Sequence, residues 1–97
     1  MIYLQSQIKL HPGKIGDFTG VMNKLAAVLT SKHGWKLVGS FATMVGRLDT
    51  VLDLWELPDL GAYQAALSDP EVIRFGPRIQ EIVADEILSF VTRLPIG

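Results

Sequence analysis

The chain of 97 residues contains no cysteine. This absence excludes disulfide bonds, thiolate catalysis and cysteine-ligated zinc sites, and it fits a reducing compartment. Neither sign of charge dominates, because 9 Lys and Arg residues stand against 10 Asp and Glu residues and no basic run occurs. A protein that binds nucleic acid through its phosphates needs such a basic surface. The composition therefore argues against a nucleic-acid partner.

Long apolar runs are also missing. No stretch approaches the ~18 consecutive apolar residues of a membrane-spanning helix. Residues 1–10 alternate between apolar and polar side chains, unlike the continuous apolar core of a secretory signal. We therefore expect a cytoplasmic protein that does not associate with membranes.

Recognisable cofactor motifs are absent as well. The isolated Gly13, Gly16 and Gly20 do not have the spacing of a dinucleotide-binding loop. His11 and His33 lie far apart in the sequence, and neither has an acidic residue at metal-ligand spacing, so we expect both in solvent. We expect no metal ion, no haem and no other cofactor.

What the chain does have is a high apolar content for its size. Hydrophobic residues make up 48% of the sequence and the mean hydropathy is +0.29. Ninety-seven residues predict a single domain, 1–97, and a chain this short buries only about two-thirds of its unfolded surface. We expect a partner to cover part of its apolar surface, and a second copy of the chain is the partner we favour.

The order of periodic segments predicts the fold. Alternation over 1–10 is typical of a strand, apolar residues three and four apart from Ile15 predict a helix that ends at Gly34, and residues 34–56 predict a hairpin. A second helix is expected after Pro58-Asp59, restarted at Asp69-Pro70 with Asp69 as N-cap, and a last strand over 87–94. The order strand, helix, strand, strand, helix, strand predicts an α+β ferredoxin-like fold, βαββαβ. Its four-stranded antiparallel sheet would carry both helices on one face.

Several short motifs resemble those of the NIPSNAP family. They are Leu10-His11-Pro12-Gly13-Lys14 before the first helix, Gly34-Trp35 and Phe41, the Gly46-Arg47-Leu48-Asp49 turn, Leu54-Trp55-Glu56, and Asp69-Pro70. The resemblance is densest over residues 34–56. It implies a homodimeric α/β barrel, in which two copies pack sheet against sheet.

The strand around Asp53 provides the candidate site. One of its faces carries Val51, Asp53 and Trp55, and the other carries Leu52 and Leu54. We expect the aliphatic face to meet the helices, because it has no polar group to bury. The mixed face would then line a cavity between the two sheets of the dimer.

Asp53 is the candidate catalytic residue. Burial between Val51 and Trp55 would raise its pKa toward the range useful for a general acid or base. NIPSNAP sequences often carry histidine at the matching position, so the resemblance implies that an ionisable group is kept here. Two alternatives stay open: Asp53 pairs with an arginine such as Arg93, or it lies in water at the cavity mouth.

Five further residues are candidates for contacting a ligand. Trp55, Phe41 and Val51 would supply apolar contacts, and Thr43 and Ser6 would supply polar ones. Ser6 and Ile8 stand where NIPSNAP sequences usually show arginine and tyrosine, which implies a more apolar cavity in this chain.

The sequence leads to two hypotheses of different class. In the first, the homodimer binds a small apolar or aromatic metabolite, with cofactor-free oxygenation, isomerisation or cyclisation as the reaction and Asp53 as the proton-transfer group. In the second, the chain is a non-catalytic ligand-binding or assembly module.

Overall fold

The structure, a computed structural model, describes all residues, 1–97, and has an α+β fold. Its elements in chain order are β1 (Ile2–Leu10), α1 (Ile15–His33), β2 (Lys36–Ala42), β3 (Thr50–Leu57), α2 (Leu60–Leu67), α3 (Pro70–Ile73), α4 (Gly76–Ile82) and β4 (Val83–Val91). The predicted ferredoxin-like order is confirmed, with the second helix divided into α2, α3 and α4. None of the helices combines the length and apolarity needed to cross a lipid bilayer.

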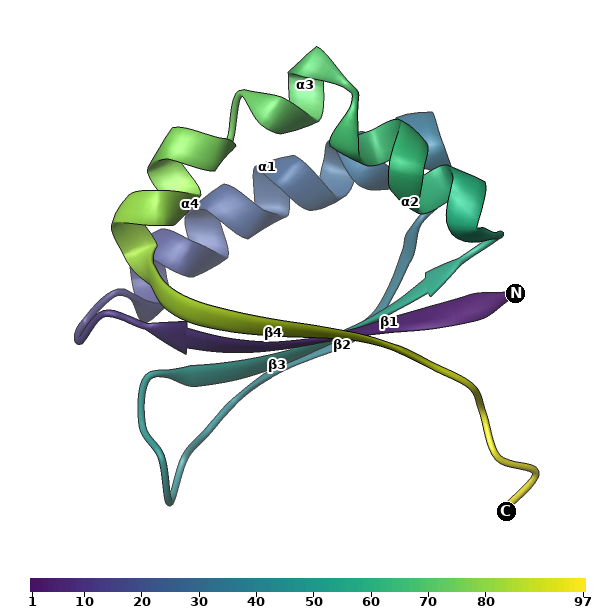
Figure 1. The fold of residues 1–97 in the computed structure, drawn as a ribbon. Helices are drawn as coiled ribbons and strands as arrows, with labels where there is room; N and C mark the ends of the chain where they lie inside the picture. The colour runs from purple at the N-terminus through teal and green to yellow at the C-terminus, as the bar shows by residue number, and fades with distance from the viewer.

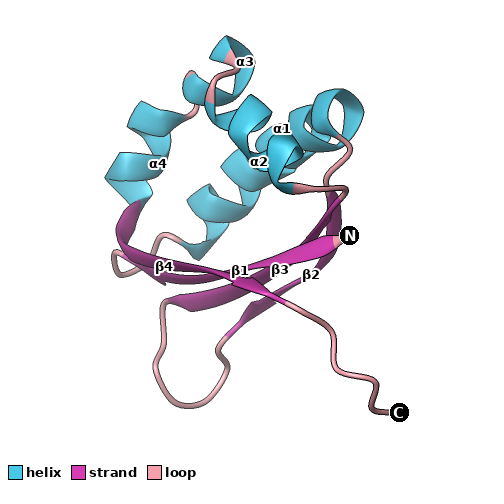
Figure 2. Ribbon diagram, turned by 45° about the vertical axis from the view of Figure 1, so that its right-hand side comes forward, coloured by secondary structure: helices cyan, strands magenta, loops and turns pink.

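The four strands form one antiparallel sheet in the order β2-β3-β1-β4. All helices lie on one face of this sheet, and the opposite face has no helix over it (Figure 1). The loop between β2 and β3 and the segment after β4 both leave the sheet toward that open face (Figure 2). Strands β2 and β4 are the edges of the sheet, so any space between helices and sheet can open at either side.

Local sequence signals set the helix boundaries. Gly34 ends α1 with a left-handed φ of 71°, as the glycine after the helical pattern predicts. The carboxylates of Asp59 and Asp69 accept hydrogen bonds from backbone N–H groups in the first turns of α2 and α3. Proline follows Asp69 at the start of α3, where its missing N–H costs nothing. The N-cap predicted at Asp69 is confirmed.

The core lies between the sheet and α1. One cluster of buried residues joins α1, the strands β1 and β3, and α2, and its members are Leu4, Leu25, Leu29, Trp35, Trp55, Leu57 and Ala66. A second cluster lies toward the start of α1 and the end of α4, and it contains Ile8, Leu10, Phe18, Val51 and Ile82. Both clusters therefore include side chains of β3 from the face that carries Asp53.

The face assignment made for β3 from the sequence is wrong. Val51, Asp53 and Trp55 are buried beneath the helices, whereas Leu52 is exposed on the open face and Leu54 is half-buried there. The assignment rested on the cost of burying a carboxylate, and the fold offsets that cost with a serine hydroxyl from the neighbouring strand. The last strand also begins earlier than predicted, at Val83.

Candidate functional site

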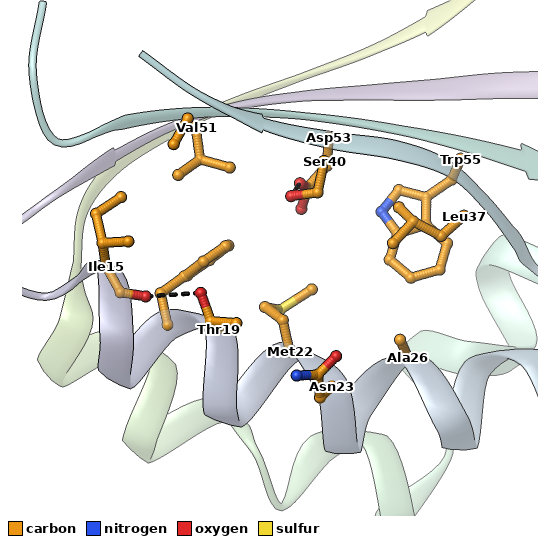
Figure 3. A pocket seen from close by; sticks show the side chains of 12 residues that line it. Ile15, Thr19, Met22, Asn23, Ala26, Leu37, Ser40, Val51, Asp53 and Trp55 are labelled. Carbon is orange, nitrogen blue, oxygen red and sulfur yellow. Dashed lines mark hydrogen bonds between the residues drawn. The ribbon is translucent and has the colours of Figure 1, made fainter. Parts of the chain in front are cut away.

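A cavity of about 230 Å³ lies between α1 and the two strands β2 and β3 (Figure 3). Twelve residues line it, eight of them hydrophobic. Helix α1 contributes Ile15, Phe18, Thr19, Met22, Asn23 and Ala26, and the strands contribute Leu37, Ser40, Ala42, Val51, Asp53 and Trp55. It is therefore enclosed by a single chain and lies on the opposite side of the sheet from the cavity expected between two copies.

The lining residues divide into a mouth and a floor. The residues of β2 that line the cavity are exposed, as are Thr19 and Asn23 of α1. Those of β3 are buried, and so is Phe18. Because β2 is an edge strand, the cavity opens at this side of the sheet and closes toward β3. A molecule entering past β2 would meet Asp53 on the floor.

Asp53 is the only charged residue among the twelve. It is 2% exposed, and Ser40 on β2 donates its hydroxyl hydrogen to Oδ1 of the carboxyl group. None of the ion pairs of the chain includes Asp53. Burial raises the pKa of Asp53, and the hydrogen bond from Ser40 opposes part of that rise. A buried carboxyl group without a cation is suited to hold or release a proton.

Trp55 forms the other end of the floor. Figure 3 shows the nitrogen of its indole ring directed into the cavity, toward the side where Asp53 and Ser40 lie. Trp35 meets the ring edge-on, with 5.5 Å between centroids and 73° between planes, and Trp35 itself stacks on Tyr63. The Nε1 of Trp35 donates to the carbonyl of Ala62 at 3.1 Å. Trp35 is thus a structural anchor that fixes the ring of Trp55.

The structure brings together three of the six candidate residues named from the sequence. Val51, Asp53 and Trp55 share the cavity. Ser6 is buried opposite Asp53 in the β1–β3 register, on the same face of the sheet, but does not line the cavity. Phe41 is 62% exposed and stands opposite Leu52, on the open face.

Other sequence-based expectations need correction. Thr43 lies in the loop after β2, beyond the sheet, so it does not line the cavity with Asp53. Arg93, considered as a partner of Asp53, lines a separate groove with Tyr3 and Glu56 on the open face. It cannot pair with a carboxylate beneath the helices.

Sequence reasoning missed the polar partner of Asp53. The pairing between β2 and β3 shifts between Leu37 and Gly39, and this irregularity places Ser40 opposite Asp53. Asn23 also lines the cavity, and its position could have been inferred, because it directly follows Met22, which lies on the predicted inner side of α1. The missing information was which strand face that helix covers.

His33 is not the solvent-exposed side chain that the sequence suggested. Its Nε2 lies 2.7 Å from Oδ2 of Asp69, and Lys32 Nζ lies 2.9 Å from the same oxygen. Asp69 also accepts a hydrogen bond from the backbone N–H of Glu71. Lys32, His33 and this backbone group lower the pKa of Asp69 well below its usual range. The cluster ties the end of α1 to the start of α3 and lies outside the cavity.

The fold and the cavity define a ferredoxin-like α+β protein with a one-chain pocket beneath its helices. A family model described as NIPSNAP matches residues 7–93. The chain therefore belongs to the NIPSNAP family, and the resemblance drawn from its motifs is confirmed. No curated protein matches it in sequence.

Solved structures agree with this assignment at the level of the fold. An uncharacterised NIPSNAP domain protein from Burkholderia xenovorans superposes with a TM-score of 0.85 at 19% identity, covering 100% of this chain and 98% of the other. Protein Atu4242 from Agrobacterium tumefaciens gives 0.85 at 20% identity, with 100% and 97% covered. A structure described as an antibiotic biosynthesis monooxygenase gives 0.73 at 15% identity, with 98% and 100% covered.

Proposed function

We propose that this NIPSNAP protein is a homodimer that binds a small, uncharged, apolar or aromatic metabolite in the cavity beneath α1. We propose further that Asp53 exchanges a proton with that metabolite, with no cofactor. The observation that carries the proposal is the placement of Asp53: a buried carboxyl group, bonded to one serine hydroxyl, on the floor of a mostly apolar cavity.

The size and charge of the cavity support this class of ligand. Benzene fills an engineered protein cavity of about 150 Å³, so 230 Å³ suits a single substituted ring. No Lys, Arg or His lines the cavity. An anionic ligand would therefore lose its hydration beside a carboxyl group without gaining a cation. A neutral ring could pack on Trp55 and Phe18 and offer a hydroxyl or amide hydrogen to Asp53.

Proton transfer is the chemistry that the site supports. A carboxyl group whose pKa is raised by burial can take a proton from an acidic C–H or O–H and return it. Such a transfer begins isomerisations, cyclisations and some oxygenations of electron-rich aromatics. The fold similarity to a protein described as a monooxygenase keeps oxygenation among the candidates.

The homodimer rests on the open face of the sheet. Phe41, Leu52 and Ile87 are exposed there, on three different strands. Two arms, the β2–β3 loop and the segment after Val91, extend beyond this face (Figures 1 and 2). A second copy packed sheet against sheet would cover these side chains and lie between the arms.

A non-catalytic binding module is the second candidate. The cavity is smaller than the roughly 300–1,000 Å³ typical of ligand pockets. In this alternative the same cavity holds a ligand, and Asp53 supplies a hydrogen bond without moving a proton.

Binding is tested by titrating the protein with p-cresol and, separately, with benzoate, followed by NMR chemical shifts. The proposal predicts that p-cresol shifts cavity resonances and benzoate does not. Asp53→Asn should weaken p-cresol binding about tenfold, because a neutral acceptor replaces a charged one. Asp85→Asn is the matched control, since Asp85 stands opposite Lys9 on the exposed side of β4. Equal binding of both compounds, or none by p-cresol, would contradict the proposal.

Catalysis is tested with 2-indanone, a neutral aromatic ketone with acidic C–H groups, incubated in D₂O with the protein. We expect the protein to accelerate exchange of these hydrogens and Asp53→Asn to abolish the acceleration. Binding of 2-indanone without accelerated exchange would favour the non-catalytic alternative. Ala26→Leu, which fills the cavity from α1, should abolish both binding and exchange while leaving the fold intact.

A further inference from the structure

A second carboxylate stands on the same side of the sheet as Asp53. Asp53 lies opposite Ser6 in the β1–β3 register, and Glu86 lies opposite Ile8 in the β1–β4 register. Ser6 and Ile8 are two residues apart on β1 and are both buried beneath the helices. Because side chains two apart on a strand share a face, Glu86, Ser6 and Asp53 all point to the helix side.

Ser6 and Ile8 of β1 stand between the strands that carry the two carboxyl groups, Ser6 beside Asp53 and Ile8 beside Glu86. Neighbouring strands are about 4.8 Å apart and two residues span about 6.8 Å along a strand, so the Cα atoms of Asp53 and Glu86 are about 12 Å apart. Ser6 is 6% exposed, and Asp53 takes its hydrogen bond from Ser40 on the other side.

The two carboxyl groups act on each other. Glu86 is exposed at the β4 edge, but partial burial against the sheet still raises its pKa, and the negative charge of Asp53 raises it further. The residues of α1 that line the cavity with Asp53 are all uncharged. The cation of α4, Arg78, is paired with Asp17 and Glu81. Asp53 is therefore the charged group that raises the pKa of Glu86.

Glu86 also has access to water that Asp53 lacks. The helices leave β4 partly uncovered, since Leu88 and Phe90, on the same face as Glu86, are 43% and 46% exposed. The cavity of Asp53 opens at the opposite edge, past β2. A ligand in the cavity would close that route, and the β4 edge would stay open.

We propose that Glu86 is the second proton-carrying group of the site, exchanging protons with Asp53 past Ser6 and with solvent at the β4 edge. It is a positioning residue, because it acts through Asp53 and does not touch the cavity. The inference rests on the proposed function in one respect, that Asp53 moves a proton. Two carboxyl groups that interact lose their protons one after the other, so over some pH range the site would hold both a base and a proton reserve.

The test is a carboxyl ¹³C NMR titration of the protein without ligand, so that it does not depend on any metabolite. We expect the Asp53→Asn variant to titrate Glu86 at a lower pH than the wild type, because the charge that raises its pKa is gone. Asp85→Asn, a substitution one residue before Glu86 but on the open face, should leave the Glu86 midpoint where it is. In the wild type, coupling to Glu86 should make Asp53 titrate in two steps. In Glu86→Gln, Asp53 should titrate in one step.

An unchanged Glu86 midpoint in Asp53→Asn, or an equal shift in Asp85→Asn, would overturn the proposal. A second readout separates proton supply from electrostatics. Glu86→Gln should leave p-cresol affinity within about twofold while slowing 2-indanone exchange severalfold and changing its pH profile. Full exchange at all pH values in Glu86→Gln would overturn the role in proton supply. Failure of p-cresol to bind would instead contradict the proposed function. The NMR titration would still decide whether Asp53 and Glu86 are coupled, because it uses no ligand.

Discussion

Ser40 on the edge strand β2 donates a hydrogen bond to Asp53 on β3, and this is the only side-chain hydrogen bond formed by the buried carboxyl group. The bond joins the exposed mouth of the cavity to its buried floor. It also explains how a carboxyl group is tolerated beneath the helices, because a hydroxyl replaces part of the water lost on folding. The remaining cost of burial keeps the pKa of Asp53 raised.

The stability of the protein should depend on the charge of Asp53. A raised pKa in the folded state means that folding favours the protonated carboxyl group. The stabilising effect of protonation is complete below the ordinary value of 3.8 and is lost as the pH rises through the raised value. We therefore expect Asp53→Asn to be more stable than the wild type at pH 7, with the difference shrinking toward low pH.

Urea unfolding at a series of pH values measures this difference. Asp85→Asn removes one negative charge from the exposed side of β4 and controls for net charge. If the wild type and Asp53→Asn differ by the same free energy at every pH, the burial of Asp53 does not perturb its titration.

The cluster at Asp69 should have the opposite pH dependence. Its pKa is lowered, so the ionised carboxylate stabilises the fold above the ordinary value of 3.8, and this stabilisation is lost as the pH falls through the lower folded value. We expect the wild type to approach the stability of Asp69→Asn in strong acid and to exceed it at neutral pH. Lys32→Gln should give an intermediate curve, because Lys32 is one of the groups that hold the charge. Parallel curves for wild type and Asp69→Asn would contradict this account.

Gly20 inside α1 and Gly34, the residue that ends this helix, should respond oppositely to substitution by alanine. Gly20 lies inside the helix, and a Cβ there would meet nothing within 4 Å, so Gly20→Ala should stabilise the protein by about 0.5–1 kcal/mol. Gly34 has a φ of +71°, and its Cβ would lie 3.3 Å from Cγ of Pro58. Gly34→Ala should destabilise by about 1–2 kcal/mol. Thermal unfolding of both variants measures these changes in stability. Destabilisation by Gly20→Ala would contradict the structure, in which the added Cβ meets no neighbouring atom.

A charged residue introduced on the open face tests whether the protein dimerises through that face. Sedimentation at micromolar concentration should give about twice the chain mass of 10.7 kDa. Phe41→Asp should yield a folded monomer, because the new carboxylate would be buried between the two sheets. Ala65→Asp, on an exposed position of α2, should remain dimeric. A monomeric wild type would contradict the proposal that a second copy of the chain covers the open face.

The sequence was sufficient for the order of elements and for several of their boundaries. Local signals carry that information: the glycine at position 34 and the Asp69-Pro70 cap each depend on a few neighbouring residues. The spacing of Ile15, Phe18 and Met22 also identified the inner side of α1, and all three line the cavity. Periodicity within one element is a property of that element alone, which is why it could be predicted.

The face of β3 could not be predicted in the same way. Both alternating faces of that strand contain large apolar residues, and the choice between them depends on the elements packed around it. The irregular pairing of β2 brings Ser40 to Asp53, and Trp35 supplies the edge-on contact to Trp55. These are contacts between separate segments, and they favour the mixed face beneath the helices. Of the six candidate residues, Val51, Asp53 and Trp55 line the cavity, and Ser6, Phe41 and Thr43 do not.

The central claim is that the cavity beside Asp53 binds a small neutral aromatic molecule. The most direct measurement is a crystal structure of the protein soaked with 4-bromophenol, in which anomalous scattering locates the bromine atom. The account predicts the bromine between α1 and β3, with the phenol oxygen within hydrogen-bond distance of the Asp53 carboxyl group and the ring against Trp55. A cavity that stays empty while the compound binds on the open face of the sheet would contradict it.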